Sequence, residues 1–149
     1  MRPNSPVWIG IALNTHLPTR PHRPLVIVLD DDAAVRNSLK FSLGIEGFSV
    51  SALSSSDELL NSPDLPFCCC LIVDQRLPGL TGLELLALLR KRDIAIPAIL
   101  VTTHPDATVR KVAREAGVPI VEKPFLESAL LDHILAAVSD SKRRGEARL

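Results

Sequence analysis

The sequence has no pattern of cysteines that would support disulfides or a metal centre. Its three cysteines, Cys68–Cys70, are consecutive. Because side chains alternate between the two faces of a strand, consecutive cysteines cannot converge on one metal ion as CxxC pairs do. Three thiols also give no even disulfide framework, which favours a reducing cytoplasm. We therefore expect the cysteines to pack as buried apolar side chains at the start of a strand.

Long apolar runs are also missing. The one apolar run near the N-terminus, Val7–Leu13, is bounded by Pro6 and Asn14 and is too short to span a bilayer. A signal peptide is only weakly supported, because no small-residue cleavage site follows this run. We expect a cytoplasmic protein with no membrane partner.

Acidic residues are absent before Asp30, and charge is unevenly spread. Lys and Arg balance Asp and Glu at 17 each over the whole chain, but residues 25–138 hold 10 basic against 15 acidic residues. We expect residues 1–24, with five of the twelve prolines, to be a flexible basic extension. Residues 140–149 should be a basic tail. For both basic ends of the chain, exposure to solvent is the preferred interpretation over contact with an acidic partner or nucleic acid. Residues 25–139, with no visible repeat, should form one domain with a full core.

Apolar runs alternate with helical patterns along this domain. The expected strands are Val26–Leu29, Phe48–Leu53, Cys68–Asp74, a fourth starting at Pro97 and a fifth starting at Pro119. The expected helices run from Ala33 to the region of Gly44–Gly47, from Ser56 to Asn61, from Thr81 to Arg92, from Pro105 to Gly117 and from Leu126 to Val138. Thr81 and Glu84 should form a capping box. The alternation predicts an α/β fold with a parallel, doubly wound sheet.

Carboxylates, a hydroxyl and an amine stand at the ends of four of the expected strands: Asp30–Asp32, Asp74, Thr102 and Lys123. Periodicity does not fix the strand order, but in a flavodoxin-like order of 2-1-3-4-5 these strand ends would surround one crevice. Carboxylates about 4 Å apart repel by roughly 1 kcal/mol in water and by about 4 kcal/mol in a partly buried site. Such a cluster favours a hard cation with oxygen ligands, Mg²⁺. Mg²⁺ and Lys123 together would offset the charge of a phosphoryl group arriving at Asp74.

These residues resemble the CheY-like receiver domain of two-component response regulators. The likeness covers about Leu25–Ser139, and its motifs are Val28-Leu29-Asp30-Asp31, Val73-Asp74 with Pro78 and Gly82, Leu100-Val101-Thr102 and Lys123-Pro124-Phe125. The resemblance implies a flavodoxin-like sheet of five parallel strands in the order 2-1-3-4-5 with five helices. It further implies a stand-alone phosphoacceptor, not an enzyme, that receives a phosphoryl group from a sensor histidine kinase or a phosphotransfer protein.

The resemblance also assigns roles to single residues. It implies phosphorylation of Asp74, with Mg²⁺ held directly by Asp31, Asp74 and the backbone carbonyl of Arg76, and through water by Asp30. Thr102 would hydrogen-bond the phosphoryl oxygen, and Lys123 would pair with it. Mg²⁺ is the implied cofactor, and the acyl phosphate would shift a two-state equilibrium.

Some positions depart from the family pattern. An aromatic switch residue often stands three positions before the lysine, but Ile120 stands there in this chain, which puts coupling by a rotating ring in doubt. Arg76 and His104 occupy positions that commonly tune the lifetime of the phosphate. We hypothesise that both shield or contact the phosphoryl group, while His104 also has a simpler interpretation as an exposed loop residue.

The resemblance places the output surface on the helix ending at Gly117, the strand starting at Pro119 and the last helix. A downstream protein would bind there, and a homodimer would use the same face, with charges such as Arg110 and Asp132 pairing across it. About ten residues follow Val138, too few for a DNA-binding domain, so we expect no direct nucleic-acid binding. The output would pass to another protein, or the chain is a fragment of a longer regulator.

Two other functions remain open. A strand ending in Asp-x-Asp also resembles haloacid-dehalogenase-like phosphohydrolases, in which Asp30 would be the nucleophile and Asp32 the acid/base. Thr102 and Lys123 would then serve as the second and third motifs of that family. Against this interpretation, no acidic pair follows Lys123 on a further strand end, and the chain is too short for the cap domain that is usual in the family. It also leaves Asp74 without a role. Asp32 is better explained by the first turn of a helix. The last alternative is an interaction module without phosphate chemistry, which would show no Mg²⁺-dependent response.

Overall fold

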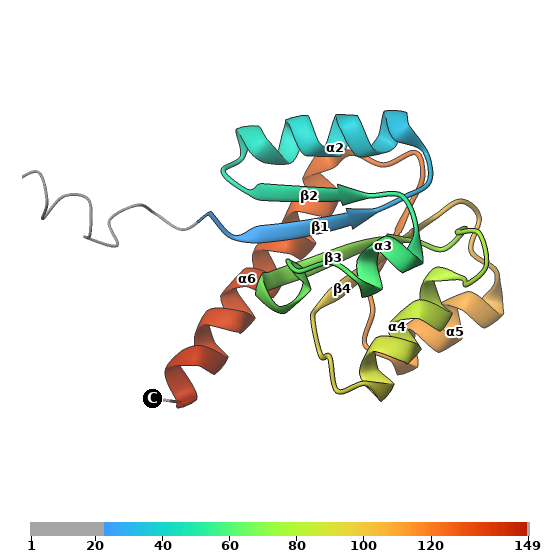
Figure 1. Cartoon of the computed structure of the whole chain (residues 1–149). Helices are drawn as coiled ribbons and strands as arrows, with labels where there is room; N and C mark the ends of the chain where they lie inside the picture. Colours follow the sequence, from blue (N-terminus) through green and yellow to red (C-terminus); the bar gives the residue numbers. More distant parts are fainter. Residues whose placement is uncertain (1–22, 149) are drawn as a thin grey trace, which may run out of the picture.

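The computed structural model describes residues 23–148, and the side chains of residues 23–140. Five parallel strands form one sheet with helices on both faces (Figure 1). The strands are β1 (Leu25–Leu29), β2 (Ser49–Leu53), β3 (Cys68–Asp74), β4 (Ala98–Thr102) and β5 (Ile120–Glu122), in the order β2-β1-β3-β4-β5. The predicted fold class and strand order are confirmed.

Each of the α-helices that follow the strands begins within two residues of its predicted start. The helices are α2 (Ala33–Ile45), α3 (Ser56–Leu60), α4 (Gly82–Lys91), α5 (Ala107–Glu115) and α6 (Glu127–Arg148), with a short 3-10 helix η1 at Leu65–Phe67. Side-chain oxygens cap the first four of them, supplied by Asp32, Ser55, Thr81 and Asp106. These caps satisfy backbone N–H groups that the first helical turn leaves without partners. The predicted capping box of Thr81 and Glu84 is present.

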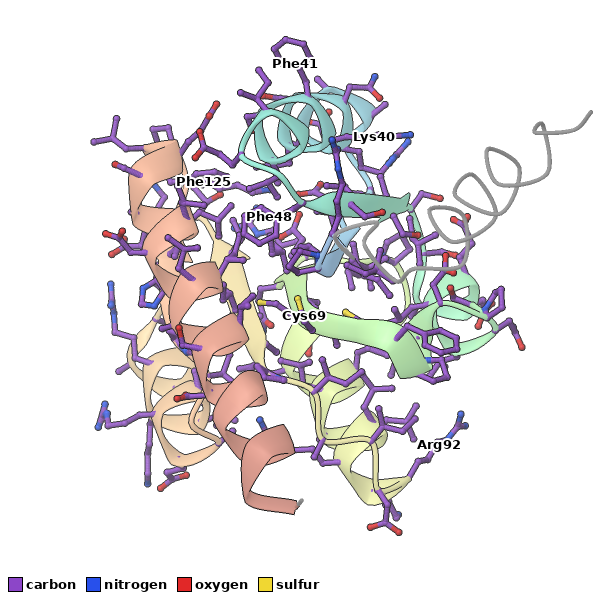
Figure 2. The ribbon with its side chains drawn as sticks, turned by 90° about the vertical axis from the view of Figure 1, so that its left-hand side faces the viewer. Lys40, Phe41, Phe48, Cys69, Arg92 and Phe125 are labelled. Atoms are coloured by element: carbon purple, nitrogen blue, oxygen red, sulfur yellow. The ribbon has the colours of Figure 1, made fainter. Side chains whose placement is uncertain are left out.

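The core has two layers, one on each face of the sheet. Consecutive residues of the central strands, such as Val26 and Ile27, belong to opposite layers. One layer packs against α3, α4 and α5, and the other against α2 and α6. In Figure 2, Phe48 and Phe125 lie between α2 and α6, whereas Phe41 points away from the molecule. Burial on both faces explains why the strands read as continuous apolar runs.

The cysteines pack as predicted. Cys68 and Cys70 are buried, Cys69 is half-buried, and all three are free thiols. Burial raises the pKa of Cys68 to about 12 and also raises the pKa values of Cys69 and Cys70. The thiols therefore remain protonated at neutral pH and act as small apolar side chains.

The last helix is longer than predicted. Its expected end was Val138, but α6 continues to Arg148, and Figure 1 shows its C-terminal part reaching beyond the sheet. The apolar pattern ends at Val138 because the helix leaves the core there, and neither Gly nor Pro follows before Gly145 to stop it. The predicted flexible extension falls almost entirely on residues 1–22, outside the described part of the chain. None of the helices within residues 23–148 has the length and apolar content needed to cross a membrane.

Candidate functional site

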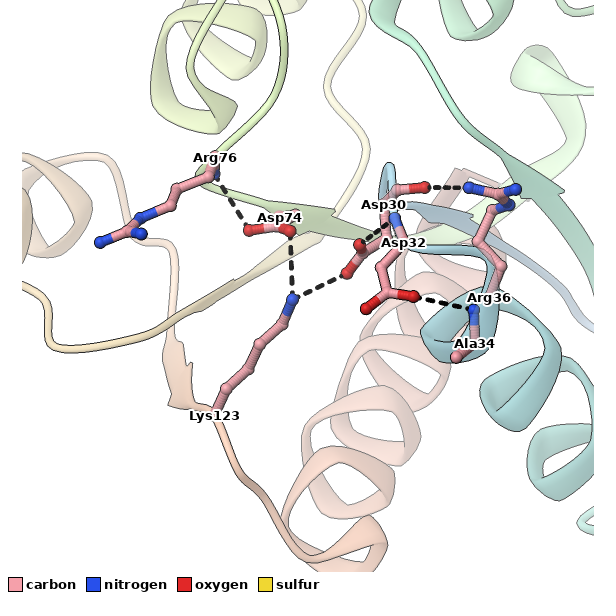
Figure 3. Close-up of polar contacts among 7 residues, drawn as sticks. All are labelled: Asp30, Asp32, Ala34, Arg36, Asp74, Arg76 and Lys123. Atoms are coloured by element: carbon pink, nitrogen blue, oxygen red, sulfur yellow. Dashed lines mark hydrogen bonds and ion pairs between the residues drawn. The ribbon is translucent and has the colours of Figure 1, made fainter.

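The four polar groups predicted at strand ends lie at the same edge of the sheet. Asp30 follows β1, Asp74 ends β3, Thr102 ends β4 and Lys123 follows β5. These four strands are consecutive neighbours, so their carboxyl ends meet at the position where open α/β sheets bind ligands. Figure 3 shows Lys123 reaching from the β5 side toward both aspartates.

Lys123 bridges two buried carboxylates. Its Nζ lies 2.9 Å from Oδ2 of Asp30 and 3.1 Å from Oδ2 of Asp74. The two aspartates are only 3% and 5% exposed. Burial lowers the pKa of Lys123, but the hydrogen bonds to both carboxylates outweigh this effect and the pKa is raised, so the ammonium stays charged. Its charge compensates a cluster that would otherwise be strongly unfavourable.

Main-chain groups fix the remaining carboxylate oxygens. The backbone N–H of Arg76 donates to Oδ1 of Asp74 at 3.0 Å, and that of Asp32 donates to Oδ1 of Asp30 at 2.9 Å. Burial raises the pKa of Asp30, and the hydrogen bonds from Asp32 and Lys123 oppose this shift only in part. Burial therefore disfavours the charged form of Asp30.

The donor set fits a hard divalent cation. Carboxylate oxygens of Asp30, Asp31 and Asp74 all lie within 4.8 Å of one another. Within the described chain, no hydrogen bond or ion pair engages the Asp31 carboxylate or the Arg76 carbonyl oxygen. Carboxylate and carbonyl oxygens are the ligands that Mg²⁺ prefers in proteins, and here two such groups without hydrogen bonds to the described residues lie beside two buried carboxylates. Asp32 does not share this role, because its carboxylate accepts a hydrogen bond from Ala34 N at 2.9 Å and caps α2.

Comparisons with known proteins agree with this geometry. The family model of the response regulator receiver domain matches residues 26–135. The chain belongs to this family. Nodulation protein W of Bradyrhizobium diazoefficiens is 35% identical over 142 residues, which cover 95% of this chain and 61% of that protein. The transcriptional regulatory protein FixJ of the same organism is 35% identical over 119 residues, covering 78% of this chain and 58% of that protein.

A solved structure of the response regulator StyR is also similar. It matches with a TM-score of 0.75 and 36% identity, covering 85% of this chain and 64% of that one. The chain therefore spans less than two thirds of the length of these relatives. Receiver domains are signalling phosphoacceptors rather than classical enzymes, and they generally bind Mg²⁺ at their acidic pocket. The haloacid-dehalogenase alternative is not favoured, since the comparisons support a receiver and the Asp32 carboxylate is engaged as a helix cap.

The structure also describes the other residues predicted for the site. Thr102 is 3% exposed, and its hydroxyl has no hydrogen-bond partner among residues 23–140. Arg76 and His104 are exposed, and His104 has a positive φ of 49°. Neither side chain forms a hydrogen bond or ion pair in the part of the chain that the structure describes. Ile120, at the usual aromatic position, is half-buried at the start of β5.

The structure also describes an ion pair on the face that the sequence analysis predicts to carry the output. Arg110 of α5 pairs with Glu122 of β5 at 3.2 Å, inside the same chain. The suggested pairing of Arg110 with Asp132 across a dimer therefore has a competitor within the protomer. The ion pair is solvent-exposed on both sides, so its contribution to stability is small, roughly 0–1 kcal/mol.

Sequence reasoning missed three residues that hold the site in place. Arg36 donates from Nη1 to the carbonyl oxygen of Asp30 at 2.8 Å, a contact that no sequence pattern indicates. The motif containing Gly82 does not indicate a role for this residue, yet a Cβ there would lie 2.6 Å from the Asp74 carbonyl oxygen. Gln75 accepts a hydrogen bond from Leu83 N at 3.0 Å, which no sequence pattern indicated.

Proposed function

We propose that Asp74 is the phosphoacceptor for a histidine residue of a sensor kinase or a phosphotransfer protein. A carboxylate oxygen of Asp74 attacks the phosphorus, an O–P bond forms, the N–P bond breaks, and the imidazole leaves with its electron pair. The observation that carries the proposal is the bridge from Lys123 to buried Asp74, which places a cation beside the attacking carboxylate. It supplies charge that can pair with phosphoryl oxygens when they arrive.

Asp31, Asp74 and the Arg76 carbonyl are the proposed direct ligands of Mg²⁺, with Asp30 acting through water. Mg²⁺ held by these residues would offset negative charge on the phosphoryl oxygens. The three clustered carboxylates and the carbonyl without a partner in the described chain support this assignment.

Thr102 is the proposed hydrogen-bond donor to the phosphoryl group. Its buried hydroxyl has no partner in the described chain, and a buried polar group without a partner costs about 1–3 kcal/mol. A phosphoryl oxygen would remove that cost. Because the Lys123 N–H donates to the Thr102 carbonyl at 2.8 Å, the two proposed phosphoryl ligands are joined through the main chain.

The proposed output follows from this link. Movement of Thr102 and Lys123 toward the phosphate would shift the loops after β4 and β5, and those loops lead into α5 and α6. Helices α5 and α6 each carry an exposed apolar residue, Val112 and Leu135, and Arg110 of α5 pairs with Glu122 of β5. We propose that a downstream protein, or a second copy of the chain, binds the face made by α5, β5 and α6 in a phosphorylation-dependent way.

The phosphodonor needs a surface beside the site. A cavity of about 460 Å³ opens next to Lys123, between α2 and the segment after β5, and is lined mainly by apolar atoms. We propose that the phosphodonor protein contacts this region while its histidine reaches Asp74. Arg76 and His104, exposed on the loops after β3 and β4, are the proposed tuning residues for the lifetime of the acyl phosphate.

Mass spectrometry tests the proposed function directly. The protein is incubated with Mg²⁺ and acetyl phosphate, and wild type is compared with Asp74→Asn and Asp30→Asn. A phosphoryl adduct on wild type that disappears in Asp74→Asn is the expected result. An adduct that survives in Asp74→Asn but not in Asp30→Asn would indicate the phosphohydrolase alternative, and no adduct on wild type would indicate an interaction module without phosphate chemistry.

A further inference from the structure

Gln75, the residue after Asp74, joins three parts of the site. Its N–H donates to the carbonyl oxygen of Val101 in β4 at 3.0 Å. Its own carbonyl oxygen accepts from Gly82 N at 3.0 Å, and its side-chain Oε1 accepts from Leu83 N at 3.0 Å. One residue therefore holds the end of β3 to β4 and to the start of α4.

The side-chain hydrogen bond matters because the first turn of a helix has N–H groups without internal partners. In α4 the Thr81 hydroxyl accepts from Glu84 N at 3.1 Å, a cap provided from within the helix start itself. Leu83 N instead receives its partner from Gln75, on the strand side of the loop. The helix is thus tied to the strand end that carries the phosphoacceptor.

The loop between these ties has little internal support. Of the backbone N–H groups of residues 76–81, that of Leu80 donates to the carbonyl oxygen of Pro78 at 3.1 Å, a bond inside the loop. The N–H of Arg76 donates to Asp74 Oδ1 at 3.0 Å and that of Thr81 donates to Glu84 Oε1 at 2.9 Å, so both of these bonds lead out of the loop. Gly79, with a positive φ of 87°, lies at the turn. The position of the Arg76 main chain accordingly depends on how the two ends of the loop are held.

We infer that Gln75 is a positioning residue that fixes the main chain of Arg76 for Mg²⁺ binding and for the hydrogen bond to Asp74. This inference rests on the proposed function, because the Arg76 carbonyl is a proposed metal ligand. Gln75 does not touch the metal ion or the phosphoryl group in this assignment. It acts by keeping the loop closed, so that Arg76 does not have to be ordered when the ion binds.

The test compares three variants of the full chain. Gln75→Leu removes the side-chain oxygen that accepts from Leu83 N with little change in volume. Gln75→Glu keeps an acceptor oxygen at the end of a side chain of the same length. Thr81→Ala is the matched control, since it removes a cap from the same helix start without touching the strand end. Mg²⁺ affinity is measured by titration calorimetry at high ionic strength, which screens the added charge of the glutamate. Hydrogen exchange of the Leu83 amide is measured without Mg²⁺.

Gln75→Leu should weaken Mg²⁺ binding about tenfold, as loss of a supporting partner of a metal ligand commonly does, and should accelerate exchange at Leu83. Gln75→Glu should restore both properties, and Thr81→Ala should lose stability without a comparable loss of Mg²⁺ affinity. Equal losses of affinity in Gln75→Leu and Thr81→Ala, or no loss in Gln75→Leu, would overturn the positioning role alone. Absence of Mg²⁺ binding by wild type would instead overturn the proposed function and the inference together.

Discussion

Replacing Gly82 by alanine should destabilise the domain, although alanine is the better helix former. Gly82 is the first residue of α4, and an added Cβ would lie 2.6 Å from the carbonyl oxygen of Asp74 and 2.8 Å from Cδ1 of Leu100. Neither neighbour can easily yield, because one is strand backbone and the other belongs to a fully buried side chain. The start of α4 would have to move away by roughly 0.8 Å to reach an ordinary contact distance.

The size of the effect follows from opposing contributions. Overpacking of a tight interior costs about 1–3 kcal/mol. The shift also weakens the hydrogen bonds from Gly82 N and Leu83 N to Gln75, each of which contributes about 1 kcal/mol. Helix propensity returns at most about 1 kcal/mol at an interior position, and less at the first residue of a helix. We expect a net loss of about 2 kcal/mol in the free energy of unfolding.

Gly44→Ala is the matched control, because Gly44 lies inside α2 and has no atom within 4 Å of an added Cβ. Because Gly44 is the second-last residue of α2, that change should stabilise the domain by no more than about 0.5 kcal/mol. Urea unfolding followed by circular dichroism should place the midpoint of Gly82→Ala on the order of 1 M below wild type, and that of Gly44→Ala above it. A Gly82→Ala protein as stable as wild type would refute the close packing of α4 on the Asp74 strand end.

Other predictions concern the thiols, the core and the phosphate. Cys68–Cys70 should react much more slowly with a thiol reagent in the native protein than in urea, because burial raises their pKa values; rapid native labelling would contradict the packing of β3. Leu85→Ala, at a residue with 0% exposure, should cost about 2–5 kcal/mol in urea unfolding. Phe41→Ala, at a residue 72% exposed, should stay within about 0.5 kcal/mol of wild type, and equal losses would refute this assignment of the core. Combined substitution of Arg76 and His104 by alanine should change the rate of dephosphorylation measured by loss of the adduct, and an unchanged rate would remove both from the proposed site.

The sequence was sufficient to predict the site residues that stand at the end of a strand. Asp30, Asp74 and Thr102 each end an apolar run, and Lys123 follows one after Glu122. Parallel pairing of β1, β3, β4 and β5 was enough to bring these residues together. The capping box at Thr81 was equally predictable, because it depends on residues three positions apart.

Contacts that depend on side-chain reach were not predictable. The bond from Arg36 to the Asp30 carbonyl requires the orientation of α2 relative to β1, and that of Gln75 to Leu83 requires the shape of the intervening loop. The close approach of Gly82 is a property of how α4 packs on β3. The true end of α6 was missed for another reason, because apolar periodicity reports contact with the core and carries no information about a helix that continues beyond it.

The sequence separation within the site has a consequence for protein synthesis. Lys123 contacts Asp30 across 93 positions and Asp74 across 49 positions. Closing such long segments of chain costs entropy that is recovered only when the sheet between them has formed. A growing chain on the ribosome holds every carboxylate of the cluster well before it holds the lysine. The phosphoacceptor site therefore forms late in translation, after β5 has emerged, and nascent chains that stop earlier lack the Lys123 bridge.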